Sequence, residues 1–263
     1  MQRTPSPPPA TPWGWAGAGA LLGLLLALVL FAPAHWLASA LATATRGQLS
    51  LQDARGTVWD GSAQLLLSGG AGSLDASTLP SRVEWRVRPR WLGAAVQLQT
   101  ACCLAQPAQV TLLAHWGGSR VLVADSQSQW PADLLKGLGT PWNTLQPQGQ
   151  LAVATQGLSI EWDAGRLVVA GSARVDALQM SSRLSTLKPM GSYRFVLSGG
   201  NVARVRLETL EGSLLLSGQG QWVGARLHFD GEASAVPERL DALSNLLNII
   251  GRRQGARAII KLG

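Results

Sequence analysis

Hydrophobic and polar positions follow two patterns that meet near residue 45. Residues 13–32 are twenty consecutive positions without a charge, filled between residues 16 and 31 mostly by Leu, Ala, Val and Gly. After residue 45, short runs alternate between hydrophobic and polar residues, as in Arg82-Val83-Glu84-Trp85-Arg86-Val87-Arg88. Alternation with period two is typical of antiparallel strands that bury one face. The pattern predicts a hydrophobic N-terminal helix followed by a mainly β domain.

The hydrophobic run is long enough to cross a membrane, because about twenty apolar residues in a helix span the roughly 30 Å hydrocarbon core. A cleavable signal peptide is the alternative, since Arg3 gives a positive start and residues 38–40 or 42–44 offer small-residue cleavage sites. The run is longer than the roughly 7 to 15 residues of a signal-peptide core. We therefore predict a single uncleaved transmembrane signal anchor over residues 13–36, bracketed by Trp13, Trp15 and Trp36.

The flanking charges predict the orientation of this anchor. Arg3 precedes the run closely, whereas the first cation after it is Arg46, which favours an N-terminus inside the cell. Residues 1–12 contain five prolines and are predicted to be a disordered cytoplasmic tail. Residues 46–263 would then lie on the far side of the membrane as one β-rich domain. A division of this domain into two lobes, with a boundary near residues 130–148, is left open.

Turn residues and glycine spacing predict how the β domain is arranged. Asp60-Gly61 and Asp163-Ala164-Gly165 each separate two alternating runs and predict hairpin turns. Glycines that open alternating runs recur at intervals of about twenty residues, enough for one hairpin each: Gly149, Gly171, Gly191, Gly212 and Gly231. The spacing predicts a long, twisted antiparallel meander sheet whose apolar face must be covered by curling, sandwiching or helices.

Few helices are expected in this domain. Residues 237–250 begin with Pro and place Leu240, Leu243, Leu246, Leu247 and Ile250 on one stripe, which predicts a C-terminal helix covering one face of the sheet. Shorter helices are predicted at residues 131–138 and 181–187, and a closing strand at residues 257–262.

The chain is basic, with a formal net charge of +7. Its densest cation cluster is Arg82, Arg86, Arg88 and Arg90, and a second is Arg252, Arg253 and Arg257. Nucleic acid is an improbable partner across a membrane, so we interpret these clusters as solvated faces that attract lipid head groups or acidic proteins.

Candidate chemistry is sparse. His228 and Asp230 fall on one side of a predicted strand, but neither a third metal ligand nor a nucleophile motif accompanies them. Glycine-rich residues 68–72 and 198–201 do not precede predicted helices, so they lack a phosphate-binding helix N-terminus. We predict no catalytic, cofactor-binding or metal-binding residues and no enzymatic activity.

The adjacent pair Cys102 and Cys103 supplies all the cysteines of the chain. A disulfide between neighbouring residues is strained, because Cα atoms joined by a trans peptide are about 3.8 Å apart, below the roughly 4.4 to 6.8 Å usual for a disulfide. Free thiols are therefore expected, with a disulfide between the two cysteines as the alternative. The strand patterns around five tryptophans predict roles in sheet packing: Trp59, Trp85, Trp116, Trp162 and Trp222.

Three further segments carry a family resemblance: Leu138-Gly139-Thr140-Pro141-Trp142-Asn143-Thr144-Leu145-Gln146-Pro147-Gln148-Gly149, Ser182-Arg183-Leu184-Ser185-Thr186-Leu187-Lys188-Pro189-Met190-Gly191-Ser192-Tyr193 and Asn245-Leu246-Leu247-Asn248-Ile249-Ile250-Gly251-Arg252-Arg253. With the Asp60-Gly61 hairpin and the strand ending Pro89-Arg90-Trp91, they resemble the general secretion pathway protein N family, the N component of the type II secretion system. The resemblance covers essentially the whole chain. It assigns no role to the cysteine pair.

The resemblance implies a single-pass inner-membrane protein with its bulk in the periplasm, acting as an accessory or scaffold component in the export of folded proteins. Such a protein would work by contact, through strand edges or the basic face, with other type II secretion components and the inner-membrane bilayer. The alternative is a periplasmic β-groove protein that binds or carries lipid or another hydrophobic ligand. A dry apolar groove would favour lipid, a polar cleft containing His228 would favour catalysis, and a closed core with bare edges would favour a scaffold.

Overall fold

The computed structural model describes residues 13–70, 72–163, 166–224 and 226–263. The helical segments are α1 (Trp13–Leu30), α2 (Ala34–Ala44), the 3₁₀ turn η1 (Ala132–Leu138), α3 (Trp142–Leu145), the 3₁₀ turn η2 (Pro237–Arg239) and α4 (Leu240–Ile250). The strands are β1 (Leu49–Gly56), β2 (Asp60–Ser68), β3 (Ala76–Thr78), β4 (Val83–Arg90), β5 (Gly93–Thr100), β6 (Ala108–His115), β7 (Gly118–Val123), β8 (Ser126–Pro131), β9 (Gln148–Asp163), β10 (Arg166–Ser181), β11 (Gly191–Ser198), β12 (Arg204–Gly212), β13 (Leu214–Val223), β14 (Arg226–Ala235), β15 (Arg252–Gln254) and β16 (Arg257–Leu262).

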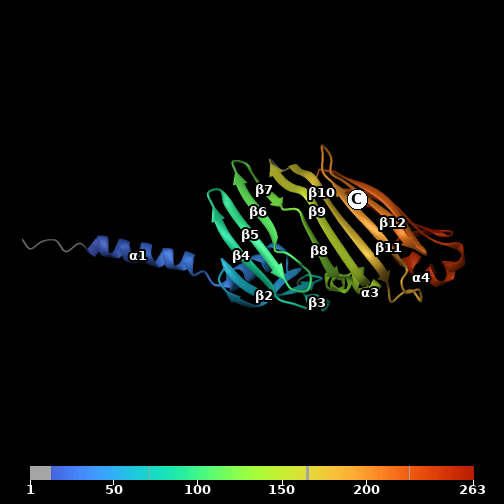
Figure 1. Ribbon diagram of the computed structural model, residues 1–263, viewed down its shortest axis with the longest axis horizontal. Helices are drawn as coiled ribbons and strands as arrows, with labels where there is room; N and C mark the ends of the chain where they lie inside the picture. The colour runs from blue at the N-terminus through green and yellow to red at the C-terminus, as the bar shows by residue number, and fades with distance from the viewer. Residues whose placement is uncertain (1–12, 71, 164–165, 225) are drawn as a thin grey trace, which may run out of the picture.

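Across the described residues these strands form one antiparallel, sixteen-stranded open sheet (Figure 1). Its order is β1-β2-β4-β5-β6-β7-β9-β10-β11-β12-β13-β14-β16-β15, with β3 beside β2 and β8 beside β9. Most neighbours in space are neighbours in sequence, so the predicted antiparallel meander is confirmed. The segment 130–148 contains η1 and α3, and the sheet continues across it through β7 and β9.

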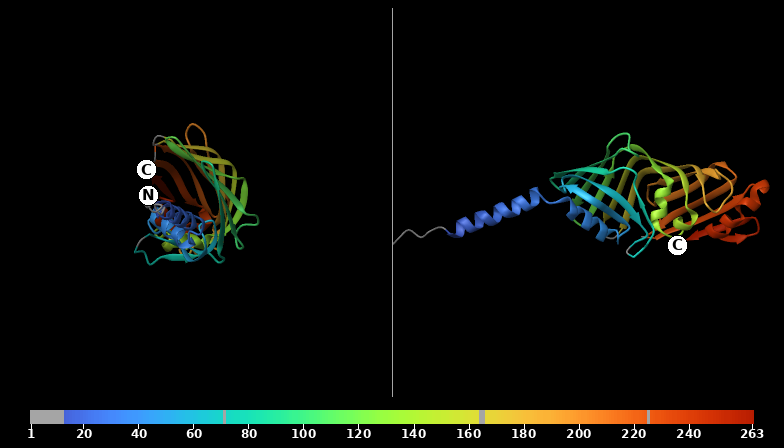
Figure 2. Two further views of the ribbon diagram at one scale, coloured as in Figure 1. Left: turned by 90° about the vertical axis from the view of Figure 1, so that its left-hand side faces the viewer. Right: turned by 90° about the horizontal axis from the view of Figure 1, so that it is seen from below.

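The sheet has one apolar and one polar face, as the period-two alternation requires. Figure 2 shows the sheet end-on as an arc with helix α2 on its inner side. We call the face that α2 contacts the inner face and the opposite one the outer face. Strand register places on the inner face a continuous apolar set: Ala63, Trp85, Leu98, Val110, Val121, Val169, Val175, Leu207, Phe229 and Ala258.

Helices cover parts of the inner face. Helix α4 buries Leu243, Leu246 and Leu247, which are at most 2 % exposed, in a core that includes Phe229 and Ala233. The predicted helical stripe and its contact with the sheet are therefore confirmed. At the other end, α2 packs through Ala34 against the inner-face residues of β2 and β4, and η1 contributes Leu134 to a third cluster.

The N-terminal hydrophobic run is divided into two helices. α1 ends at Leu30, and the extended backbone at Pro33 precedes α2, which lies on the sheet. Trp36, predicted to mark the end of the membrane span, is therefore part of α2. Among the helices of the described residues, none combines the length and apolar character that a membrane crossing requires.

The first predicted hairpin exists, but its turn is displaced. The turn occupies residues 57–59, and Asp60-Gly61 already belongs to β2. A Cβ atom at Gly61 would lie 2.6 Å from Cζ2 of Trp85 and 2.6 Å from the Arg55 carbonyl oxygen. Glycine is needed there because the buried indole of Trp85 packs against the backbone, a tertiary contact that imitates a turn signal in the sequence.

Three other local predictions have different outcomes. The strands flanking Asp163-Ala164-Gly165 pair as predicted, while residues 164–165 lie outside the described part. The closing strand at residues 257–262 is confirmed as β16. The helix predicted at residues 181–187 is wrong, because the hydroxyls of Ser182 and Ser185 accept hydrogen bonds from nearby backbone N–H groups and form turns there.

Candidate functional site

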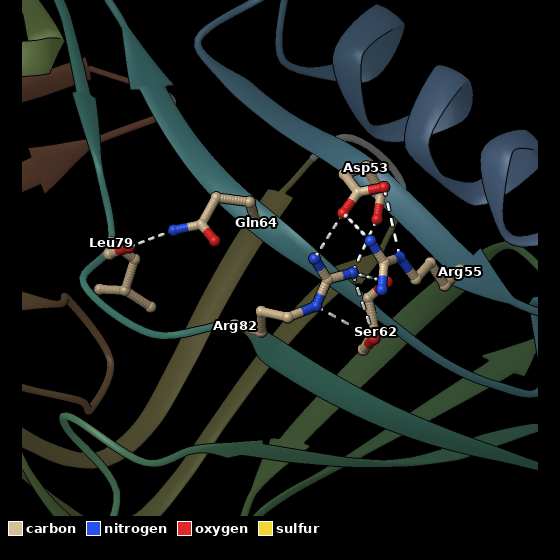
Figure 3. Close-up of polar contacts among 6 residues, drawn as sticks. All are labelled: Asp53, Arg55, Ser62, Gln64, Leu79 and Arg82. Atoms are coloured by element: carbon tan, nitrogen blue, oxygen red, sulfur yellow. Dashed lines mark hydrogen bonds and ion pairs between the residues drawn. The ribbon is translucent and has the colours of Figure 1, made fainter.

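The basic cluster at residues 82–90 is divided by its contacts into neutralised and free arginines. Arg82 donates from Nη1 to Oδ2 of Asp53 at 2.8 Å and from Nη2 to the Asp53 carbonyl oxygen at 2.7 Å, and it also contacts Ser62 (Figure 3). Arg55 donates to the same carboxylate. These contacts tie the start of β4 to β1 and β2, so Arg82 has a structural role.

The electrostatics of this network follow from the shared carboxylate. The hydrogen bond from Arg55, followed by that from Arg82, holds the pKa of Asp53 below its usual value of 3.8. Asp53 thus stays ionised and neutralises part of the predicted basic cluster. The side-chain amide of Gln64 donates to the Leu79 carbonyl oxygen and fixes the loop that leads to Arg82 (Figure 3).

Further along β4, one arginine is paired and the last two are not. Arg86 pairs with Asp60 at 3.1 Å. Arg88 and Arg90 are exposed, and neither forms an ion pair with any residue that the structure describes. The cationic surface available to a partner is therefore the end of β4 rather than the whole strand.

Charged side chains form cross-strand ladders elsewhere on the outer face. Asp176 of β10 accepts two hydrogen bonds from Arg194 of β11, at 2.7 and 2.9 Å. The hydrogen bond from Arg194 is the largest influence that lowers the pKa of Asp176. Opposite charges on adjacent strands stabilise strand pairing. Asp176 and Arg194 therefore have a structural role in the sheet.

His228 and Asp230 lie on the outer face of β14, in a polar surface depression of about 720 Å³ that also includes Arg204, Arg206 and Glu208. Both side chains are exposed, and Asp230 pairs with Lys261 at 3.7 Å. The described residues contain no cluster of three His, Cys, Asp or Glu side chains that could hold a metal ion. His228 has no hydrogen bond to Asp230 within the described set. The depression offers charge for a contact, but not an organised dyad.

The inner face is apolar and only partly covered. Outside the contacts with α2, η1 and α4, large side chains on it remain accessible: Leu112 is 41 % exposed, Trp162 46 % and Phe195 40 %. Apolar surface that remains accessible in a folded domain commonly marks an interaction site. The alternating pattern in the sequence indicated that one face of the sheet is apolar. It could not show which apolar positions the helices leave uncovered.

The cysteine pair corrects a prediction. Cys102 and Cys103 form a disulfide, with their Cα atoms 3.7 Å apart, instead of the free thiols expected. Cys103 is buried, and its carbonyl oxygen accepts a hydrogen bond from the backbone N–H of Gln129 at 2.9 Å. The pair therefore forms a turn after β5 that contacts β8, and sequence spacing alone could not choose between thiols and this turn.

The tryptophans divide into packed and exposed ones. Trp85 is buried as predicted, and Trp222 packs against a hydrophobic cluster of the sheet. The packing role predicted for Trp116 is wrong, because it lies in the β6–β7 turn with its side chain fully exposed. The side chain of Trp91, in the β4–β5 turn, is almost as exposed. The glycine that follows Trp116 was the available sequence signal for a turn.

Both ends of the sheet present strand edges. Within the described chain, β1 pairs with β2 alone, and β15 pairs with β16 alone. β15 is short and carries Arg252 and Arg253, features that discourage uncontrolled pairing. β1 is the longer edge, which makes it the better candidate for adding a strand from a partner.

A family model described as "Type II secretion system (T2SS), protein N" matches residues 47–260. No curated protein and no solved structure gives a significant match to the chain. The matched region begins just before β1 and ends within β16, so it includes the sheet and α4. The resemblance seen in the sequence is confirmed, and the chain belongs to the type II secretion system protein N family.

Proposed function

We propose that the protein is an inner-membrane-anchored accessory component of the type II secretion system, with its β domain in the periplasm, and that it acts by protein–protein contact. The family match over residues 47–260 carries this proposal. The residues that the structure describes contain no candidate metal cluster, and His228 is not organised with Asp230 for catalysis. A scaffold needs neither, because its binding energy comes from shape, strand pairing and charge.

The membrane anchor is supported by the character of α1. Its eighteen residues carry no charge, and every α1 side chain that the structure describes is exposed. A helix of this length rises about 27 Å. Bilayers accommodate a span a few ångströms shorter than their roughly 30 Å core by local thinning.

One surface supports contact with other secretion components. The β1 edge could accept a strand of a partner, with main-chain hydrogen bonds supplying affinity.

Lipid binding is the second candidate function, and the accessible inner face favours it. Leu112, Trp162 and Phe195 remain open on the concave side, where an acyl chain would bury apolar surface.

Site-specific photo-crosslinking in intact cells tests both functions. A photoreactive amino acid would replace Gln52 on β1 or Leu112 on the inner face, with exposed Asn245 on α4 as the control. We expect the probe at position 52 to capture other type II secretion proteins, and the control to capture none. Deletion of the secretion genes should abolish these products.

The inner-face probe separates the two candidates. Crosslinks from position 112 to phospholipid, with none to protein from position 52, would replace the scaffold function by lipid binding. Absence of secretion proteins from all three positions, in cells that secrete normally, would contradict the proposed function.

A further inference from the structure

We propose that the β4–β5 and β6–β7 turns form a membrane-contact surface that inserts into the head-group region of an anionic bilayer. We call this surface the tryptophan rim and define it as Trp91, Leu92 and Trp116. The proposal rests on the proposed membrane anchor and deepens it, since it specifies how the β domain would sit against the lipid.

The tryptophan rim is unpacked in the structure. Trp91 is 97 % exposed, Leu92 62 % and Trp116 103 %. Large apolar side chains at hairpin turns are unfavourable in water, and such exposure usually marks a surface that another phase or molecule covers. Sheet packing cannot account for these residues, because they lie in turns outside the strands and their side chains are exposed.

The turns of the tryptophan rim lie side by side. The backbone N–H of Ala114 donates to the Leu92 carbonyl oxygen at 2.7 Å, which joins the end of β6 to the β4–β5 turn. Gly93 also pairs with Leu113. The three residues therefore lie at the same end of the strands and could enter the same layer of lipid.

The chain also leaves α1 at this end of the strands. Trp59, in the β1–β2 turn, donates its indole N–H to the Val29 carbonyl oxygen near the end of α1 at 2.7 Å. The N–H of Val58 donates to the Ala32 carbonyl oxygen at 2.8 Å, and that of Val87 on β4 to the Trp59 carbonyl oxygen at 2.6 Å. The end of the anchor is thus hydrogen-bonded to the turn next to β4.

The charges around the rim suit an anionic lipid surface. Arg88 and Arg90 precede Trp91 and have no ion-pair partner among the described residues. Two carboxylates near the rim are occupied, since Asp60 pairs with Arg86 and Glu161 pairs with Arg120 at 2.7 Å. Asp163, beside Gly117 of the β6–β7 turn, adds one negative charge there. Tryptophan prefers the membrane–water interface, and arginines near it gain from anionic head groups. This combination, continuous with the anchor, favours lipid over a protein partner.

The test uses the full chain reconstituted in vesicles of phosphatidylethanolamine and phosphatidylglycerol that contain phospholipids brominated on the acyl chains. A fluorescent amino acid replaces Trp91, Trp116, Leu25 of α1 or Leu74, one at a time. Leu74 is the matched control, because it is 102 % exposed but lies between β2 and β3, at the opposite ends of the strands. Thermal unfolding of each variant confirms that it is folded.

We expect bromolipid quenching at positions 91, 116 and 25, and none at position 74. Replacing Arg88 or Arg90 by Gln should lower the ratio of docked to undocked rim by roughly fivefold for each residue, the equivalent of about 1 kcal/mol for a cation near an anionic surface. Vesicles of phosphatidylcholine alone should weaken quenching at the rim and leave that at position 25 unchanged.

Each other outcome gives a decision. Quenching at position 25 without quenching at 91 and 116 overturns the rim and leaves the anchor. Quenching at 91 and 116 without quenching at 25 supports the rim and contradicts the anchor. Equal quenching at 74, 91 and 116, or shielding of the rim only when other secretion proteins are added, overturns the lipid contact.

Discussion

At the scale of single residues, the outer face separates structural charges from available ones. Asp53 accepts a hydrogen bond from Arg82, which directly precedes β4, and Asp176 accepts one from Arg194 of the neighbouring strand β11. These contacts hold the sheet together. Arg88 and Arg90 have no such partner among the described residues. A cluster of cations in a sequence therefore overstates the charge that a partner would meet, because strand pairing consumes part of it.

Replacing Asp176 by Asn is expected to destabilise the protein in a pH-dependent way. The Arg194 hydrogen bond lowers the pKa of Asp176 below 3.8 in the folded state. Its contribution is therefore present above the unfolded pKa and is lost as pH falls through the folded value. At neutral pH, Asp176→Asn should cost about 1 kcal/mol and lower the Tm by roughly 2–4 °C. Thermal unfolding between about pH 7 and pH 2.5 should show the difference from wild type shrinking in acid.

Asp230→Asn is the matched control for this measurement. Asp230 also pairs across strands, but its side chain is 75 % exposed whereas that of Asp176 is 15 % exposed. Exposed pairs contribute little because water and salt screen them. An equal Tm loss in both variants would show that burial of the Asp176 pair is unimportant.

Replacing His228 or Asp230 by Ala should leave secretion of a reporter enzyme unchanged. The two side chains are exposed, and Asp230 is directed to Lys261 instead of His228. Secreted activity measured against total protein in a complementation assay checks this. If secretion is lost while the variant remains folded and abundant, a catalytic or metal role would have to be reconsidered.

At the scale of elements, glycines and helices fit the sheet through contacts distant in sequence. Gly251 ends α4 in an extended conformation, not the left-handed one typical of helix ends, and a Cβ atom there would lie 2.6 Å from the Ile259 carbonyl oxygen. Arg253 donates to Asn248 and the Ser244 carbonyl oxygen. The end of α4 is therefore set by β15 and β16 as much as by its own sequence.

Leu246→Ala in α4 should reduce stability strongly. The side chain is 2 % exposed within the main hydrophobic core, and truncating a buried Leu typically costs about 2–5 kcal/mol. Thermal unfolding of the full-length protein and its steady-state abundance should both fall. Asn245→Ala, on the exposed side of the same helix, should change stability by less than about 0.5 kcal/mol. An unchanged Tm for Leu246→Ala, with weaker partner capture, would instead identify α4 as a docking surface.

At the scale of the whole molecule, a curved open sheet with an apolar inner face needs helices or a ligand to cover it. α2, η1 and α4 cover parts of that face and leave Leu112 and Phe195 accessible. The same architecture can thus support a scaffold with free edges or a lipid-binding surface.

The hydrophobic run at residues 13–36 should remain attached to the mature protein. Its apolar length exceeds that of a signal-peptide core, and Val29 and Ala32 are hydrogen-bonded to the β1–β2 turn. Intact-mass measurement or N-terminal sequencing of protein purified from membranes should find the run retained. A mature chain that begins near Leu41 or Thr45 would show that the run is a cleaved signal peptide.

The sequence by itself determined the mainly antiparallel sheet, the C-terminal helix and the family. Alternation with period two and the stripe through Leu243, Leu246 and Leu247 are local signals, because each depends on which face of one element is buried. The absence of catalytic residues was also predicted from the sequence, and it remains a prediction.

Only the tertiary structure decided features that depend on residues far apart in the chain. It placed Gly61 under Trp85 rather than in a turn and paired Arg82 with Asp53. It also brought the turns that carry Trp91 and Trp116 together, at the same end of the strands as the β1–β2 turn that is hydrogen-bonded to α1. Such contacts depend on strand register and curvature, and a single-residue shift in register would move every side chain of a strand to the other face.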